Sequence, residues 1–147
     1  MDSHQQYSGP CHCAKLRHAS RTVSQIYDSF LEPTGLKITQ YALLRQVGRL
    51  GPVNMTELAK NMGLDRTTLV RNSKPLEERG LISSTPGRNQ RVHELCITDQ
   101  GGKVLEAATA HWEAAQKQIE SYLGQDKLDA LLGLLHELQD MPDREEQ

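Results

Sequence analysis

The chain has 147 residues, of which 37% are apolar, 24% charged and 4% aromatic, and its net charge is −2. This length suits one ordinary domain, and the apolar fraction excludes general disorder. The balanced charge excludes a bulk polyelectrolyte binder, and no apolar run approaches the roughly 20 residues that span a bilayer. Three cysteines, an odd number, argue against a disulfide-stapled secreted scaffold. Residues 1–10 lack the apolar segment of a secretory signal, so we expect a cytoplasmic, single-domain chain over residues 1–147.

The charge is unevenly distributed along the chain. Between Lys60 and Arg91 there are seven basic and three acidic residues, whereas from Asp126 onward there are seven acidic and two basic residues. A basic middle segment is what a phosphate-contacting surface needs, although an ordinary solvated face gives the same pattern. The charge alone leaves both interpretations open.

Apolar spacing predicts a mainly helical chain. Apolar residues recur at three- and four-residue steps over residues 16–30, and Pro33 and Gly35 end this first helix. Thr39 is the predicted cap of the second helix. Two segments, 81–84 and 92–98, are predicted to be the strands of a β-hairpin with a polar tip. Further helices are expected over residues 41–50, 55–62, 66–79, 105–122 and 128–138.

The sharpest signal is a short helix, a tight turn and a second helix over residues 55–79. Leu58 can pack inward, Gly63 supplies the turn, and Asp65 can cap the second helix. Leu69 and Leu76 can hold that helix against a core. The polar side chains left on its other side are Arg66, Thr67, Thr68, Arg71, Asn72 and Lys74.

These side chains suit the major groove of DNA. Arginine pairs with guanine and asparagine with adenine, while threonine and lysine can hold phosphates. The tip of the predicted hairpin adds Arg88 and Arg91, which are placed to probe the neighbouring minor groove. An ordinary helical hairpin with a polar face is the plain alternative. A helix-turn-helix followed by a basic β-wing nevertheless favours double-stranded DNA as the partner.

Five segments, in this order, resemble transcriptional regulators of the MarR (multiple-antibiotic-resistance) family. They are LKITQY at 36–41, MTELA at 55–59, DRTTLVR at 65–71, LEERGLI at 76–82 and LCITDQG at 95–101. The resemblance implies a homodimeric winged helix-turn-helix, with a DNA-binding lobe over 36–98 and dimerisation helices over 12–32 and 99–141. It also implies a repressor that binds a near-palindromic operator and is released by a small molecule.

One position departs from the family's pattern. The wing of this family usually carries Asp-x-Arg near its tip, and Arg88 stands in the Arg position. Pro86 stands where the Asp is expected. The positive charge is therefore kept, while the carboxylate that would position it is missing.

Cys11-His12-Cys13 stands at the start of the first predicted helix. A helix N-terminus and nearby cations stabilise a thiolate. Cys13 and Tyr27 match in spacing the reactive cysteine and one partner tyrosine of the organic-hydroperoxide-sensing branch, although Arg17 replaces a second tyrosine. The resemblance thus implies, as an alternative, control by an oxidant. Unreactive cysteines, or a metal site that includes His12, are the competing interpretations.

Motifs of other functional classes are missing from the sequence. It contains no glycine-rich phosphate loop, no Gly-x-Ser-x-Gly and no His-Glu-x-x-His. We therefore expect no enzymatic activity, no cofactor and no metal. A helical adaptor dimer without DNA affinity is the alternative from another class. Salt-dependent binding to duplex DNA separates the two, because phosphate neutralisation releases counterions.

Overall fold

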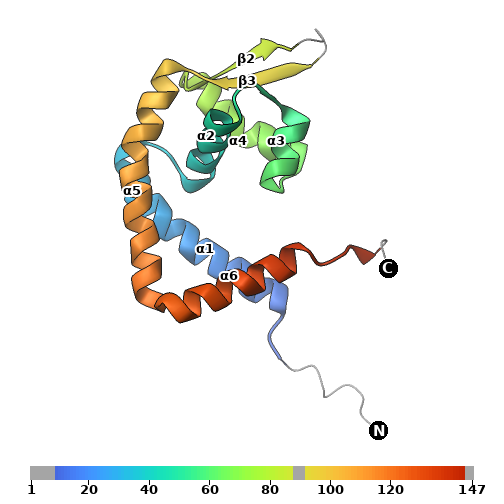
Figure 1. Ribbon diagram of the computed structural model, residues 1–147, viewed down its shortest axis with the longest axis vertical. Helices are drawn as coiled ribbons and strands as arrows, with labels where there is room; N and C mark the ends of the chain where they lie inside the picture. Colours follow the sequence, from blue (N-terminus) through green and yellow to red (C-terminus); the bar gives the residue numbers. More distant parts are fainter. Residues whose placement is uncertain (1–8, 88–91, 145–147) are drawn as a thin grey trace. The chain divides into compact units, whose positions relative to one another are not determined.

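The computed structural model describes residues 9–87 and 92–144, in which helices predominate over a small antiparallel sheet (Figure 1). Contacts divide the chain into two compact units, Met1–Trp112 and Glu113–Gln147. The predicted fold class, mainly helical with a small β-hairpin, is confirmed. In chain order the elements are α1 (His12–Leu31), the 3-10 helix η1 (Glu32–Thr34), α2 (Ile38–Leu50), β1 (Val53–Asn54), α3 (Met55–Met62), α4 (Arg66–Glu78), β2 (Ile82–Pro86), β3 (His93–Ile97), α5 (Asp99–Leu123) and α6 (Gln125–Gln139).

The sheet contains one strand more than the predicted hairpin. Its order is β1-β3-β2 with antiparallel neighbours, and Leu95 of β3 lies opposite both Val53 and Ser84. β1 has only two residues, which is too short for apolar alternation to reveal it in the sequence. β2 and β3 cover 82–86 and 93–97, where we expected 81–84 and 92–98, because their ladder runs from Ile82–Ile97 to Pro86–His93.

α2 begins at Ile38, one residue before Thr39, so the prediction that Thr39 caps this helix is wrong. The helix starts at Ile38, whose backbone N–H donates to the Asp28 carboxylate of α1 at 2.7 Å. The Gln40 side chain accepts from the backbone N–H of Lys37 at 3.0 Å. The free N–H groups at a helix start need an acceptor, and here a side chain ten residues away in α1 supplies one.

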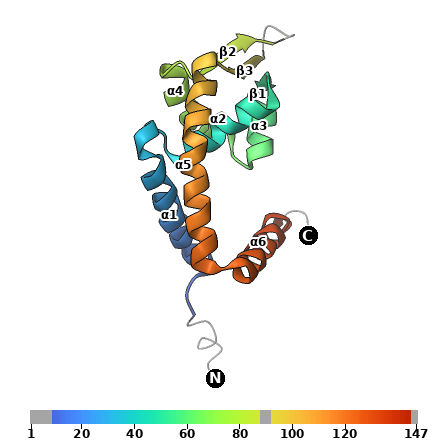
Figure 2. The same cartoon turned by 60° about the vertical axis from the view of Figure 1, so that its left-hand side comes forward.

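The core of the first unit lies where α4 packs on α2 (Figures 1 and 2). Leu69 and Leu76 of α4 are fully buried in the same apolar cluster as Leu43, Leu44 and Val47 of α2. Each such leucine contributes about 1.5–3 kcal/mol when it leaves water. The buried stripe therefore sets the rotation of α4 about its own axis.

A tight turn joins α3 to α4. Gly63 adopts a left-handed conformation (φ 65°) at the end of α3, and Leu64, partly buried against the core, donates its backbone N–H to Ala59 O at 3.0 Å. The Asp65 carboxylate then accepts from the backbone N–H of Thr68 at 2.7 Å. This bond confirms the predicted N-cap, and it fixes where the first turn of α4 begins.

Two side chains tie down the other end of α4. The Arg79 guanidinium donates to the carbonyl oxygens of Thr34 and Gly35 at 3.3 and 3.2 Å, which joins this end to the segment between α1 and α2. The Thr98 hydroxyl donates to Gly80 O at 2.6 Å and accepts from the backbone N–H of Gly101 at 3.0 Å. The end of α4 is thus linked both to η1 and to the start of α5.

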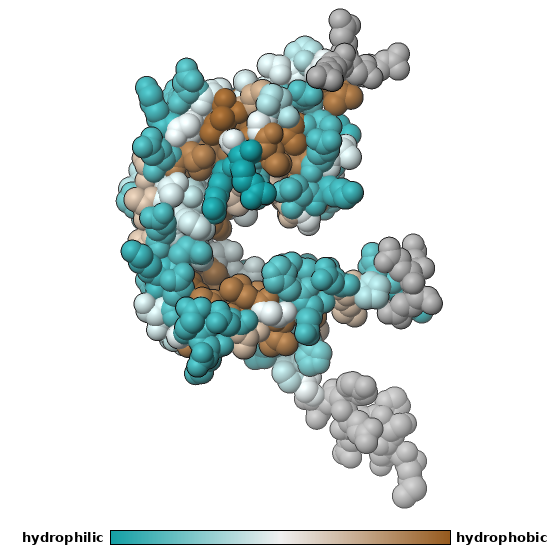
Figure 3. Space-filling view, viewed as in Figure 1, coloured by the Kyte–Doolittle hydropathy of each residue, from teal (hydrophilic) through white to brown (hydrophobic). Residues whose placement is uncertain are grey.

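The second unit consists of the later part of α5 and of α6. Gly124, with φ 79°, separates the two helices as predicted. α6 buries none of its residues, and several of its leucines are exposed (Figure 3). Among the described residues, no helix combines the length and the apolar character needed to cross a bilayer.

A pH-dependent contribution to stability is predicted for Asp65. The backbone N–H of Thr68 stabilises its ionised form and lowers the pKa of this carboxyl below about 3.8. A lowered folded-state pKa stabilises the fold above the unfolded pKa and loses that effect as pH falls. Relative to Asp65→Asn, which keeps an acceptor but does not titrate, the wild type should lose unfolding free energy below about pH 4. Urea unfolding at several pH values measures this difference, and a difference independent of pH would contradict the prediction.

Two adjacent glycines at the start of α5 provide a second test. A Cβ on Gly101 would overlap the carbonyl oxygen of Leu81, whereas Gly102 has open space around it. Gly101→Ala should therefore lower the free energy of unfolding by about 1–3 kcal/mol through overpacking. Gly102→Ala, the matched control, should raise it by up to ~1 kcal/mol because alanine favours the helix. Equal unfolding midpoints for the two variants would show that the close approach is absent.

Candidate nucleic-acid interface

The structure divides the predicted polar residues of α4 among three sides of the helix. Thr67, Arg71 and Lys74 are exposed and lie opposite the buried stripe of Leu69 and Leu76. At 3.6 residues per turn, Thr68 and Asn72 share one flank of that outward face, where both are half-buried. Arg66 is exposed on the opposite flank. The outward face is thus a row of one hydroxyl and two cationic side chains.

Pro75 does not end α4, which continues to Glu78. A proline inside a helix has no N–H to donate and so leaves the carbonyl of the residue four positions earlier without its helical partner. That residue is Arg71, whose side chain is exposed on the outward face of the helix. The backbone N–H of Arg79 donates to Pro75 O at 3.1 Å and completes the last turn.

A groove of about 490 Å³ separates the second flank of α4 from the sheet. On the α4 side the groove is lined by Arg66, Val70 and Lys74. On the other side it is lined by His93, the first residue of β3, and by Val92, which precedes it. Residues 54–56, where β1 passes into α3, line it as well. Sequence reasoning missed Val70 and His93 as candidates. The signal for Val70 was available, because it is apolar yet falls four residues after Arg66, outside the buried stripe.

The predicted wing arginines, Arg88 and Arg91, lie outside the described residues. The strands that lead to them are described: Pro86 pairs with His93, and the backbone N–H of Gly87 donates to Val92 O at 2.7 Å. The hairpin that carries the tip is therefore paired as far as Gly87 and Val92.

Asp65 also contributes to the electrostatics of this surface. Its carboxylate caps α4 and lies near enough to Arg71 for the positive charge to help lower the Asp65 pKa, after the larger effect of the Thr68 hydrogen bond. Asp65 is exposed, so water screens this attraction. Arg71 is exposed on the outward face of α4.

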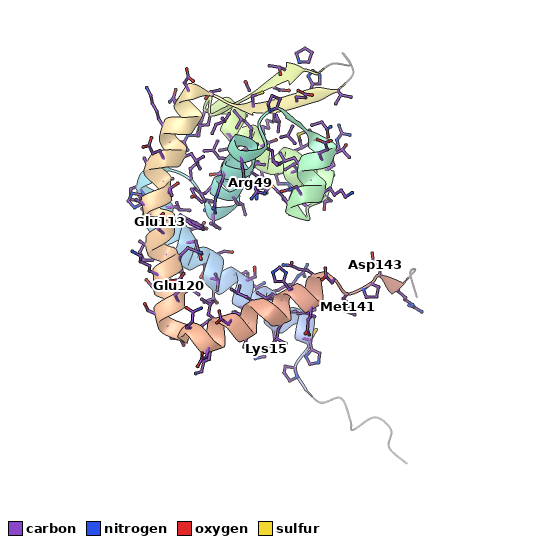
Figure 4. All side chains as sticks on the ribbon, viewed as in Figure 1. Lys15, Arg49, Glu113, Glu120, Met141 and Asp143 are labelled. Carbon is purple, nitrogen blue, oxygen red and sulfur yellow. The ribbon has the colours of Figure 1, made fainter. Side chains whose placement is uncertain are left out.

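The cysteines at the start of α1 are exposed. Cys11 is the N-cap residue and Cys13 lies in the first turn, close in sequence to Lys15, which Figure 4 labels. Tyr27 belongs to the same unbroken helix, 14 residues after Cys13, or about 21 Å along its axis. α1 therefore keeps Cys13 and Tyr27 apart within one chain. Within residues 9–87 and 92–144, no three or more His, Cys, Asp or Glu side chains gather to hold a metal.

Trp112 of α5 packs against α2 within its own chain. Its ring stacks on Tyr41 of α2 with 5.8 Å between centroids, and the guanidinium carbon of Arg45 lies 4.5 Å from the ring centroid. The Tyr41 hydroxyl also lies 3.2 Å from the Thr109 hydroxyl of α5. These contacts hold the first half of α5 on the lobe that carries α4.

Comparison with known proteins identifies transcriptional regulators that are similar in sequence and in structure. The MarR family model matches residues 36–93, which include α3 and α4. MosR, a transcriptional regulator of M. tuberculosis solved in complex with DNA, is 31% identical over 90% of this chain and 100% of its own, with a TM-score of 0.74. A probable transcriptional regulator from Pseudomonas aeruginosa is 26% identical over 86% of this chain and 96% of its own, with a TM-score of 0.79.

A third similar protein is the transcriptional repressor CouR. Bound to a 23-mer DNA duplex, it is 27% identical over 88% of this chain and 92% of its own, with a TM-score of 0.79. A second structure of CouR, bound to p-coumaroyl-CoA, is 26% identical over 90% of this chain and 94% of its own, with a TM-score of 0.78. On the identity and coverage of these matches, the chain belongs to the MarR family of transcriptional regulators.

Proposed function

We propose that this chain is a sequence-specific DNA-binding regulator that places α4 in the major groove. The observation that carries the proposal is the outward row of Thr67, Arg71 and Lys74, exposed opposite a buried stripe that fixes the helix. A single α-helix fits the major groove, where arginine pairs with guanine and lysine holds a phosphate. Arg71 is central in this row and is assigned to a base edge, and Lys74 to the DNA backbone.

The flanks of α4 and the wing complete the proposed interface. Thr68 and Asn72 on one flank, and Arg66 on the other, are assigned to the walls of the major groove. Arg88 and Arg91 are assigned to the neighbouring minor groove because, in the sequence, they fall between the paired strands β2 and β3. In this arrangement phosphate contacts position the lobe, and the base contacts of α4 read the sequence.

We further propose that the regulator is a repressor that a small-molecule ligand releases from DNA. CouR, which is similar over most of this chain, is described as a transcriptional repressor and has been solved both on DNA and with p-coumaroyl-CoA. A ligand shifts such an equilibrium only through different affinities for the DNA-bound and free conformations. An oxidant acting on Cys11 or Cys13 is a second candidate trigger, supported by the exposure of both thiols.

A second copy of the chain is the proposed cover for the apolar residues exposed on α1 and α6. These residues are Leu16, Val23, Leu131, Leu132, Leu134, Leu138 and Met141. Met141 stands just past the end of α6 (Figure 4). On this proposal residues 12–32 and 99–141 form the dimer and residues 36–98 the DNA-binding lobe. Two-fold symmetry then demands a near-palindromic operator with half-sites about one helical turn apart, or ~10 bp.

Arg71→Ala tests the role of α4. Loss of a bidentate base contact should weaken binding to the selected operator by about 1–3 kcal/mol and relax the preference at one base pair. Arg49→Ala, which removes the same charge from the exposed end of α2 (Figure 4), is the matched control and should leave the preference unchanged. The measurement is operator selection followed by titration of labelled duplex at several salt concentrations. Salt-independent or undetectable binding by the wild type would favour the adaptor dimer instead.

Charged residues on α6 test the assembly. Leu131→Glu combined with Leu138→Glu places two carboxylates on the exposed leucine face, which carries a high desolvation penalty if a partner covers it. The double variant should shift the dimer toward monomer in sedimentation experiments. Gly133→Glu adds a charge on the opposite side of α6, where a new side chain meets open space, and should leave the mass of the species unchanged. A wild-type protein that sediments as a monomer would contradict the proposed dimer.

A further inference from the structure

Val70 is the large apolar side chain that α4 leaves exposed. It is 47% exposed, although its sequence neighbour Leu69 is completely buried. The described buried residues of α4 are Leu69, Ser73 and Leu76, and Val70 lies off that stripe. An exposed valine contributes little to the core, and its β-branched side chain favours a helix less than alanine does. The exposed Val70 side chain is therefore available to contact a bound partner.

Two cationic side chains flank Val70 on α4, and one acidic residue, Glu77, also lines the groove. Arg66 and Lys74 stand four residues before and four residues after it, so the three side chains lie in one row along α4. All three line the groove between α4 and the sheet, which Val92 lines from the wing side. An apolar side chain flanked by two cations on the wall of a groove matches a partner that carries phosphates at its edges and an apolar group between them.

Thymine presents such a group in the major groove of DNA. Its C5-methyl projects beside the O4 acceptor, and apolar side chains distinguish it from the other bases. We propose that Val70 reads the C5-methyl group of one thymine in each half-site, with Arg66 and Lys74 holding the DNA on either side of it. This inference rests on the proposed placement of α4 in the major groove, and it assigns specificity to a residue outside the polar set.

Removing single methyl groups from the DNA tests the assignment. Starting from the selected operator, each thymine is replaced in turn by deoxyuridine, which keeps the base pairing and lacks the methyl group. For the wild type, one position per half-site should weaken binding by about fourfold, the equivalent of one buried methyl group. Val70→Ala should bind the thymine and deoxyuridine duplexes equally at that position. It should retain the wild-type response at every other thymine.

Val92→Ala is the matched control, since Val92 is an exposed valine that lines the other side of the same groove. It should keep the thymine preference that Val70→Ala loses. Circular dichroism and thermal unfolding check that both variants are folded, which the exposure of both side chains favours.

Three results would overturn the assignment while leaving the DNA-binding function intact. The first is a wild type that binds its operator specifically yet responds to no thymine-to-deoxyuridine change. The second is a Val70→Ala variant that keeps the full wild-type response at every position, and the third is a Val92→Ala variant that loses the response that Val70→Ala was expected to lose. Failure of the proposed function itself looks different, because the wild type then selects no sequence from the duplex pool.

Discussion

The burial of one stripe of α4 against α2 governs the rest of this structure. Leu69 and Leu76 enter the apolar core, and a helix held by such a stripe has one allowed rotation about its axis. That rotation decides that Arg71 points away from the core and that Val70 faces the groove beside the sheet. The polar surface is therefore a consequence of apolar packing, and a change in the core would alter it without touching any charged residue.

Much of the fold was predictable because its signals are local. Apolar spacing, the Asp65 cap and the glycines at 63 and 124 act within one or two helical turns, and the structure bears them out. The misses involve distant partners. Asp28 replaces Thr39 at the start of α2 from the preceding helix, and β1 exists only because β3 lies beside it. Contacts with Asp28 and with β3 join residues far apart in the chain, so the spacing of apolar residues in the sequence does not indicate them.

The candidate interface was predictable in composition and less so in arrangement. Six polar residues of α4 were identified from spacing, yet their division among an outward face and two flanks depends on which side of α4 is buried. Thr68 and Asn72 are half-buried for that reason. Val70 and His93 come together through the groove between α4 and β3, a tertiary feature that a single helical wheel does not contain. Arg79, counted at first within a basic segment, turns out to serve the backbone of residues 34 and 35.

The bonds of Arg79 join the end of α4 to the connection between α1 and α2. Its guanidinium holds two backbone carbonyls, so the link depends on where the backbone of residues 34 and 35 lies. Asp28 binds the start of α2 from the α1 side of the same connection. A rotation of α1 must therefore either carry one end of α4 with it or break both guanidinium bonds. The position of this connection is thereby coupled to the helix that carries Arg71 and Lys74.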